Sequence, residues 1–136
     1  MNYIINTINI VRINKMANHK KLDFYNMSLE LDLEISQIVE SLNKKKEYDL
    51  ARQMNRASIS IGSNISEGAG KNSVKDYLRF LRISKGSSNE LETQLLMAKN
   101  RRLISIDTYD RVNSKLVLIK RKLSGYIRKI RENHNL

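Results

Sequence analysis

The sequence predicts an all-α protein, an antiparallel up-down-up-down four-helix bundle. Three observations predict it. The 136 residues include no proline and only five glycines, whereas most strand-and-turn architectures use proline at edges and turns. Apolar residues recur at steps of three and four along four segments, which is the spacing of a core-facing helical stripe. The connections between these segments are short, and short connections force neighbouring helices to run antiparallel.

The first predicted helix begins near Leu22 and ends in the run 43–46, where three lysines favour the C-terminal end of a helix dipole. The second begins near Glu47 and is expected to stop at Gly68 and Gly70, which suit a C-terminal cap. The apolar stripes of these helices are Phe24, Met27, Leu31, Ile35, Ile38 and Leu42 in the first, and Met54, Ala57, Ile61 and Ile65 in the second.

Serines mark the starts of the other two helices. Ser73 is expected to cap the third helix, with Asp76 three residues later as a short version of the capping box. The fourth helix is expected to start behind Ser105. Their apolar stripes are Val74, Leu78, Leu81, Ser88, Leu91, Leu95 and Ala98 in the third, and Val112, Leu116, Ile119, Leu123, Tyr126 and Ile130 in the fourth.

We expect one domain, the bundle, over residues 21–132, with an N-terminal tail at 1–20 and a C-terminal tail at 133–136. The first sixteen residues lack the basic start and cleavage site of a signal peptide, and they are too short and too rich in asparagine to span a bilayer. This stretch is either a flexible tail or a reading-frame extension before Met16. The absence of cysteine suits a reducing cytoplasm, which is the predicted location.

A polar stripe runs along the second predicted helix beside its apolar one. Short hydroxyls and amides, with one arginine and one glutamate, suit bonding to another helix better than a solvent face. If the chain turns at residues 71–72, Arg56 lies level with Ser87 and within one turn of Glu90, which predicts a partly desolvated Arg56–Glu90 ion pair. The predicted structural polar network comprises Gln53, Arg56, Ser60, Asn64, Glu67, Ser87 and Glu90.

The residues argue against the common catalytic and metal sites. The run 68–73 only partly matches a phosphate-binding loop, because Ile65 stands at its first glycine, Asn72 replaces its serine or threonine, and no strand precedes it. His19 and His134 lie near the ends without clustered carboxylates, so no metal-ligand spacing is present. No nucleophile lies beside a candidate base. We therefore expect a protein that is not an enzyme and uses no cofactor.

The net charge of +11 points first to an anionic polymer, nucleic acid, and second to an anionic membrane surface. The plainer alternative is a basic protein of an AT-rich genome. Aromatic residues are not interleaved with the cations, so we expect phosphate contacts and little sequence preference. The predicted nucleic-acid-binding residues lie on the third and fourth helices: Lys75, Arg79, Arg82, Arg111, Lys115, Arg121, Lys122, Arg128 and Lys129.

Every predicted helix carries apolar residues outside its core stripe. A second apolar edge on each helix suggests contacts between subunits, so we expect a homo-oligomer. Gly62 and Gly86 lie inside predicted helices, where glycine is unfavourable, and they are expected to mark close approaches of two backbones. The off-stripe apolar residues are Leu29, Leu33, Ile59, Phe80, Leu96, Val117, Leu118 and Ile127.

Ordered motifs across the second and third predicted helices, at residues 50–61, 64–68, 77–81 and 86–95, resemble a known bacterial family. It is the four-helix-bundle family encoded in intervening sequences of large-subunit ribosomal RNA genes, and the likeness extends over about residues 20–132. This family is related to the accessory variability protein of diversity-generating retroelements. Ser66 and Ser88 depart from the family pattern, and the first sixteen residues have no counterpart in it.

The resemblance implies a basic bundle that assembles into a homopentamer and associates with nucleic acid. For the retroelement relatives it also implies a reverse-transcriptase partner. Two hypotheses therefore stand. The first is a non-enzymatic, oligomeric bundle that binds RNA or DNA mainly through phosphate contacts, and the alternative is an adaptor that docks a nucleic-acid enzyme such as a reverse transcriptase.

Overall fold

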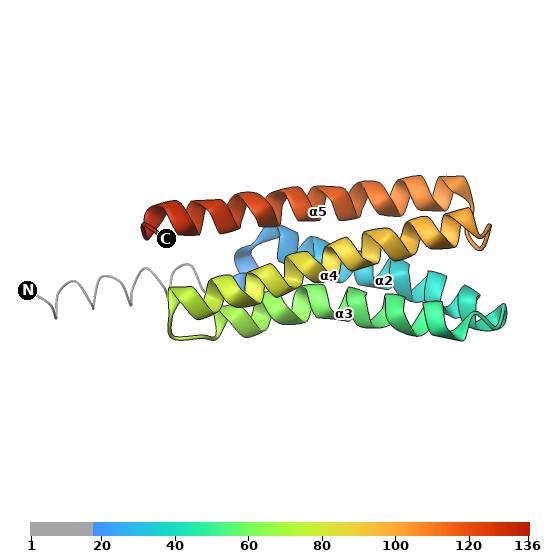
Figure 1. Ribbon diagram of the computed structural model, residues 1–136, viewed down its shortest axis with the longest axis horizontal. Helices are drawn as coiled ribbons and strands as arrows, with labels where there is room; N and C mark the ends of the chain where they lie inside the picture. Colours follow the sequence, from blue (N-terminus) through green and yellow to red (C-terminus); the bar gives the residue numbers. More distant parts are fainter. Residues whose placement is uncertain (1–17) are drawn as a thin grey trace, which may run out of the picture.

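The computed structural model describes residues 18–136 as a bundle of helices. A short 3-10 turn, η1 (His19–Lys21), precedes four long helices, which are α2 (Asp23–Lys44), α3 (Tyr48–Ala69), α4 (Val74–Asn100) and α5 (Ile106–Asn133). Successive helices run in opposite directions (Figure 1). Residues 18–136 contain no strand. The predicted fold class is confirmed.

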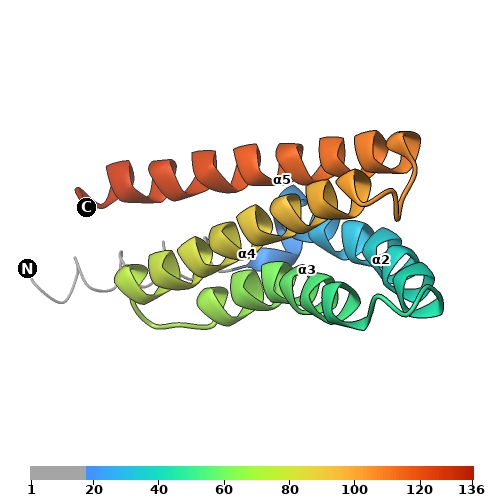
Figure 2. The same ribbon diagram turned by 45° about the vertical axis from the view of Figure 1, so that its right-hand side comes forward.

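Each long helix packs on the next one in the chain, and α5 packs back on α2, which closes the bundle. The view of Figure 2 again shows α4 running between α3 and α5. Within residues 18–136, no helix is long and apolar enough to cross a membrane. The stretch 1–16, expected to be a tail or a reading-frame extension, lies outside the described residues.

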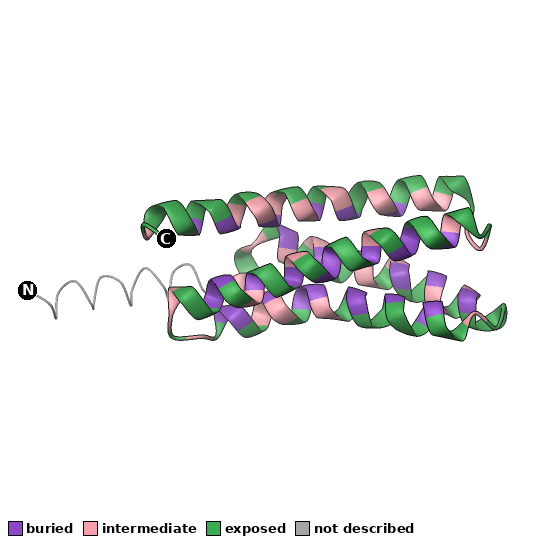
Figure 3. Cartoon of the chain, viewed as in Figure 1, coloured by how far each residue is buried: buried purple, intermediate pink, exposed green. Residues whose placement is uncertain are grey.

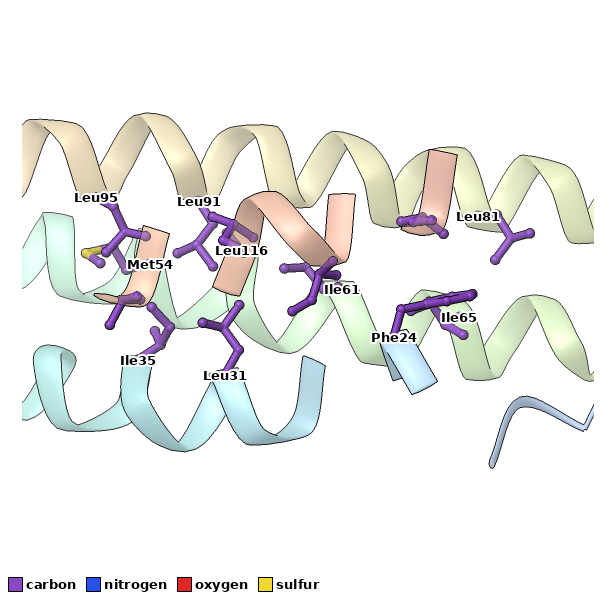
Figure 4. Packing of buried hydrophobic residues seen from close by; sticks show 14 of the residues in the cluster. Phe24, Leu31, Ile35, Met54, Ile61, Ile65, Leu81, Leu91, Leu95 and Leu116 are labelled. Atoms are coloured by element: carbon purple, nitrogen blue, oxygen red, sulfur yellow. The ribbon is translucent and has the colours of Figure 1, made fainter. Parts of the chain in front are cut away.

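The core forms along the predicted apolar stripes. Figure 3 shows buried residues along the inward sides of the helices, while the outer side of α5 is largely exposed. Ile35, Met54 and Leu95, from three different helices, point into the space between them (Figure 4). All three are fully buried.

Two serines lie fully buried within this core, at positions where α4 faces its neighbours. Ser84 Oγ donates to the carbonyl oxygen of Ile61 at 2.8 Å, and Ser88 Oγ donates to that of Lys85 at 2.6 Å. Each hydroxyl is therefore satisfied by a backbone acceptor, so its burial avoids the free-energy cost of an unpaired polar group.

The predicted N-terminal caps are confirmed, and Gly70 caps the C-terminal end of α3, as predicted. Ser73 Oγ accepts from the amide of Asp76, and Ser105 Oγ accepts from the amide of Thr108, both at 3.1 Å. Helix α3 continues through Gly68 to Ala69, and the cap residue Gly70 has a right-handed φ of −82°, so this cap does not use the left-handed conformation that glycine permits. Gly68 is buried, and it serves helix packing rather than helix termination.

Two turns use a left-handed residue that is not glycine. Lys46 follows α2 with φ 63°, and Arg102 follows α4 with φ 59°. In each turn the next backbone amide donates to a carbonyl of the last helical turn at 2.9 Å, which is the pattern of a Schellman motif. Lys45 Nζ also donates to the carbonyl oxygen of Leu103 at 2.6 Å, so the two turns are joined at one end of the bundle.

The register between α3 and α4 differs from the prediction by about one helical turn. Ser60 Oγ and Ser87 Oγ lie 2.7 Å apart, so Ser60 rather than Arg56 meets Ser87. The reason is the direction of helical side chains, which lean toward the N-terminus of their own helix. In an antiparallel pair, the residue numbers of two side chains that meet therefore add up to more than a count outward from the turn predicts.

Candidate nucleic-acid interface

Charge is distributed unevenly among the helices. Helix α2 holds five carboxylates and one lysine, which leaves a net charge of −4. Helix α4 holds five cations and three carboxylates, a net charge of +2, and α5 holds eight cations and three carboxylates, a net charge of +5. Among the four long helices, the excess positive charge therefore lies on α4 and α5, where the sequence predicts the binding residues.

Three of the predicted binding residues are paired with carboxylates of α2. Glu34 forms ion pairs with both Arg111 and Lys115, and Lys115 Nζ lies 2.8 Å from Glu34 Oε2. Lys122 forms an ion pair with Asp23. We call Arg111, Lys115 and Lys122 the paired cations. Their partners cancel much of their charge, and they hold α5 against α2.

Asp23 is the first residue of α2, and it has a second partner there. The Lys122 ammonium and the backbone amide of Phe24 both donate to its carboxylate, the amide at 2.8 Å. These bonds, led by the one from Lys122, hold the pKa of Asp23 below its ordinary value. The carboxylate is therefore ionised at neutral pH, as its pairing with Lys122 requires.

Arg79 is exposed, but its guanidinium contacts two neighbouring side chains. Its guanidinium lies over the Phe80 ring, 4.5 Å from the centroid, and its Nε lies 3.8 Å from a carboxylate oxygen of Asp76. On the other side of α4, Lys120 Nζ donates to Glu92 Oε2 at 2.6 Å and ties α5 to α4. Arg79 is therefore a weaker candidate for phosphate binding than its position in the sequence suggests.

The remaining exposed cations of α4 and α5 lie farther than 4.0 Å from every carboxylate in the described chain. Five of them were predicted as binding residues. The sixth, Arg131, is not among the predicted binding residues, although it belongs to the same basic stretch. We call this set the unpaired cations: Lys75, Arg82, Arg121, Arg128, Lys129 and Arg131.

A pair of tyrosines aligns the two helices that carry this set. The hydroxyls of Tyr77 on α4 and Tyr126 on α5 lie 3.1 Å apart, which places the start of α4 beside the end of α5. Figure 1 shows the same arrangement at the C-terminal end of α5. Burial raises the pKa of both tyrosines above its ordinary value, so they are neutral. Their role is to hold the helices together.

Part of the predicted polar network is formed. The Ser60 and Ser87 hydroxyls meet, and the Asn64 side-chain amide donates to Ser60 Oγ at 2.8 Å. Glu67 instead pairs with Lys71 at 3.0 Å. Gln53 is exposed and lines a hollow of about 230 Å³ between α3 and α4. The network is therefore a small hydroxyl and amide cluster rather than a line along the whole helix.

The predicted Arg56–Glu90 ion pair is wrong. Both residues line the same hollow, but both are exposed, and no ion pair within 4.0 Å joins them. Glu90 instead accepts from Gln94 Nε2 at 3.1 Å. Both long side chains lie at the edge of the bundle, where water competes with their mutual attraction.

Other candidate sites are few. No group of three or more histidines, cysteines or carboxylates that could hold a metal ion lies within residues 18–136. His19 contacts Ser66 at 3.3 Å, and its ring packs perpendicular to that of Tyr25, so it is part of the packing at the start of α2.

Residues 20–125 match the family described as 23S rRNA-intervening sequence protein. The chain is also similar to a crystal structure from Bacteroides thetaiotaomicron, described as a protein with unknown function from the S23 ribosomal protein family. The two are 28% identical with a TM-score of 0.74, and the match covers 76% of this chain and 97% of that chain. No curated protein matches the chain. The likeness to the retroelement accessory protein stays a prediction.

Proposed function

The chain belongs to the 23S rRNA-intervening sequence protein family, and we propose that it is a non-enzymatic, oligomeric bundle that binds RNA or DNA through phosphate contacts. The observation that carries this proposal is the set of unpaired cations on α4 and α5. An internal ion pair has much of its charge cancelled, whereas an exposed cation with no carboxylate nearby has its full charge available to a phosphate.

The ion pairs within the bundle reduce the number of predicted cations that are available to bind phosphate. Among the nine predicted residues, the paired cations contact α2, and Arg79 rests on Phe80. The other five, together with Arg131, lie where α4 starts and along the second half of α5. We propose that this half of the bundle contacts the nucleic-acid backbone, and that the assembly of several copies repeats the surface around a homopentamer.

The proposed contacts carry little base specificity. The aromatic rings of Phe24 and Tyr77 are buried, and the ring of Tyr126 is half-buried between them. These rings are therefore engaged in packing, whereas single-stranded binders present exposed aromatic faces on which bases stack. Cations on an exposed helix surface favour phosphates of any sequence.

The test is a titration of the purified full chain with labelled duplex DNA and with RNA of several sequences, at a series of salt concentrations. The proposal predicts that log affinity falls linearly with log salt, by about 0.9 per phosphate neutralised on duplex, with little difference between sequences. A chain that fails to bind at roughly 50 mM salt, where such contacts are strong, would overturn the proposal in favour of the adaptor that docks a nucleic-acid enzyme.

A further inference from the structure

Unpaired cations lie on both sides of the contact between α4 and α5. On α4, Lys75 and Arg82 are exposed and seven residues apart, so about two helical turns separate them on one side of the helix. On α5, Arg121 and Arg128 are also exposed and have the same spacing. Each helix therefore presents its free cations along a line, rather than scattered around its circumference.

One further cation on each helix lies at the edge that faces the other helix. The hydrogen bond from Lys120 on α5 to Glu92 on α4 marks these two edges. Lys85 precedes Glu92 by about two turns, and Arg131 follows Lys120 by about three, so both lie on the marked edges. Lys85 is half-buried, and no carboxylate of the described chain lies within 4.0 Å of its ammonium. We call Lys75, Arg82 and Lys85 the α4 row, and Arg121, Arg128 and Arg131 the α5 row.

The two rows are separated by the spacing of two helices that diverge. Figures 1 and 2 show α4 and α5 farther apart at the end where α4 starts than at the turn that joins them. Long side chains bridge the helices at this end, since the hydroxyls of Tyr77 and Tyr126 lie 3.1 Å apart. Axes of packed helices are about 8 to 10 Å apart. The rows are therefore separated by a distance close to the width of the major groove of B-DNA, about 12 Å.

Each row also has an exposed glycine one helical turn after one of its cations, Gly86 on α4 and Gly125 on α5. A Cβ at Gly62 would lie 3.1 Å from Ser28 Oγ of α2, so packing within the bundle explains that glycine. A Cβ at Gly86 or at Gly125 would meet nothing within 4 Å, so the close approach expected at Gly86 is absent within the chain. Glycine is unfavourable inside a helix, but it lets a ligand come close to the backbone. The two positions therefore favour a ligand that lies against both helices.

We propose that the two rows bind a double-stranded nucleic acid across its wider groove, with phosphates of one strand on the α4 row and phosphates of the other strand on the α5 row. The inference rests on the proposed function and narrows its ligand from nucleic acid in general to a double helix. A double helix holds two phosphate backbones at a fixed separation, whereas a single strand offers only one. The major groove of B-DNA and the minor groove of A-form RNA are the wide grooves that present this arrangement.

The first experiment compares one short duplex with its separated strands. The purified full chain is titrated with labelled DNA and RNA in both forms over a range of salt concentrations. Six contacts at about 0.9 each on the duplex, against three at about 0.7 each on a single strand, give a salt slope about 2.6 times larger for the duplex. The ratio is read separately for DNA and for RNA, and the larger ratio identifies the duplex whose groove matches the rows.

Two results would overturn the inference in different ways. Equal numbers of contacts on the duplex and on its strands would give a slope ratio of only about 1.3. That ratio for both DNA and RNA would overturn the two-row arrangement and leave phosphate binding intact. A chain that binds neither the duplexes nor the strands would overturn the proposed function, and this inference with it.

The second experiment removes one row at a time. One variant has glutamine at the three positions of the α4 row, and another has glutamine at those of the α5 row. Each retains a single row, so its duplex slope should fall to about half and its slope ratio to about 1.3. The matched control is Lys46→Gln with Arg101→Gln and Arg102→Gln, which removes three exposed cations from the two turns at the other end of the bundle. A row variant that keeps the wild-type duplex slope, or a control that loses as much, would contradict the inference.

Gly86→Gln and Gly125→Gln test the close approach without a change in charge. Each adds a better helix former where the chain leaves open space, so the free energy of unfolding should not fall. Affinity for the duplex should nevertheless fall several-fold, because the added side chain holds a strand away from the helix. Wild-type duplex affinity in both variants would overturn the docking of the strands against α4 and α5. Circular dichroism checks that every variant retains its helices.

Discussion

At the scale of single residues, helix packing needs glycine only where two helices lie too close together to leave room for a Cβ. Gly68 lies where α3 crosses α4, and a Cβ there would lie 2.8 Å from Phe80 Cβ and 3.0 Å from the Tyr77 ring. Gly125 faces open space within the chain. The same glycine-to-alanine change should therefore have opposite effects at the two positions.

We predict that Gly68→Ala lowers the free energy of unfolding by about 1 to 3 kcal/mol, because the added methyl overpacks the α3–α4 contact. Gly125→Ala should raise it by up to about 1 kcal/mol, because alanine is the better helix former. Urea unfolding of both variants measures the two values. A stabilising Gly68→Ala would show that α3 and α4 do not pack closely at this point.

Residue-scale features were predictable where a local rule governs them. The Ser73 and Ser105 caps need only a hydroxyl before a helical stripe, and both were found. The left-handed residues at Lys46 and Arg102 were missed, because the usual signal is a glycine and these positions have none. The Arg56–Glu90 pair was mistaken because both side chains are exposed at the edge of the bundle, where Glu90 accepts from Gln94 instead.

At the scale of helices, ion pairs between α2 and α5 both hold the two helices together and engage predicted binding cations. Glu34 is the common partner of Arg111 and Lys115, and its side chain is only 18% exposed. This single carboxylate therefore holds two of the predicted binding cations against the bundle. Its removal should loosen the contact and release both cations to solvent.

We predict that Glu34→Gln tightens nucleic-acid binding and steepens its salt dependence, while lowering stability modestly. Two freed cations add at most about 1.8 to the slope on duplex, at 0.9 each. Glu90→Gln is the matched control, since it changes the net charge equally but releases no paired cation. Identical salt slopes for the two variants would mean that the pairing with Glu34 does not limit binding.

At the scale of the whole molecule, the sequence predicted which helices carry the positive charge but not which cations are available. Net charge follows from composition, and helical periodicity assigns each lysine or arginine to a face. The pairing of Lys122 with Asp23 joins residues 99 positions apart, so it depends on how α5 lies against α2. Long-range pairs of this kind become visible only when the helices are placed in space.

The most direct measurement of the central claim compares two triple variants with the same change in net charge. One carries glutamine at Arg121, Arg128 and Lys129, which belong to the unpaired cations, and the other carries glutamine at the three paired cations. Each is titrated with duplex DNA over a range of salt concentrations, after circular dichroism shows that its helices are retained.

The first variant should bind more weakly to all sequences, and its salt slope on duplex should be smaller by up to about 2.7, or 0.9 for each lost phosphate contact. The second variant should keep most of the wild-type slope, because carboxylates of α2 already balance the cations that it lacks. An unchanged slope in the first variant, or an equal loss in both folded variants, would contradict the claim that the unpaired cations form the binding surface.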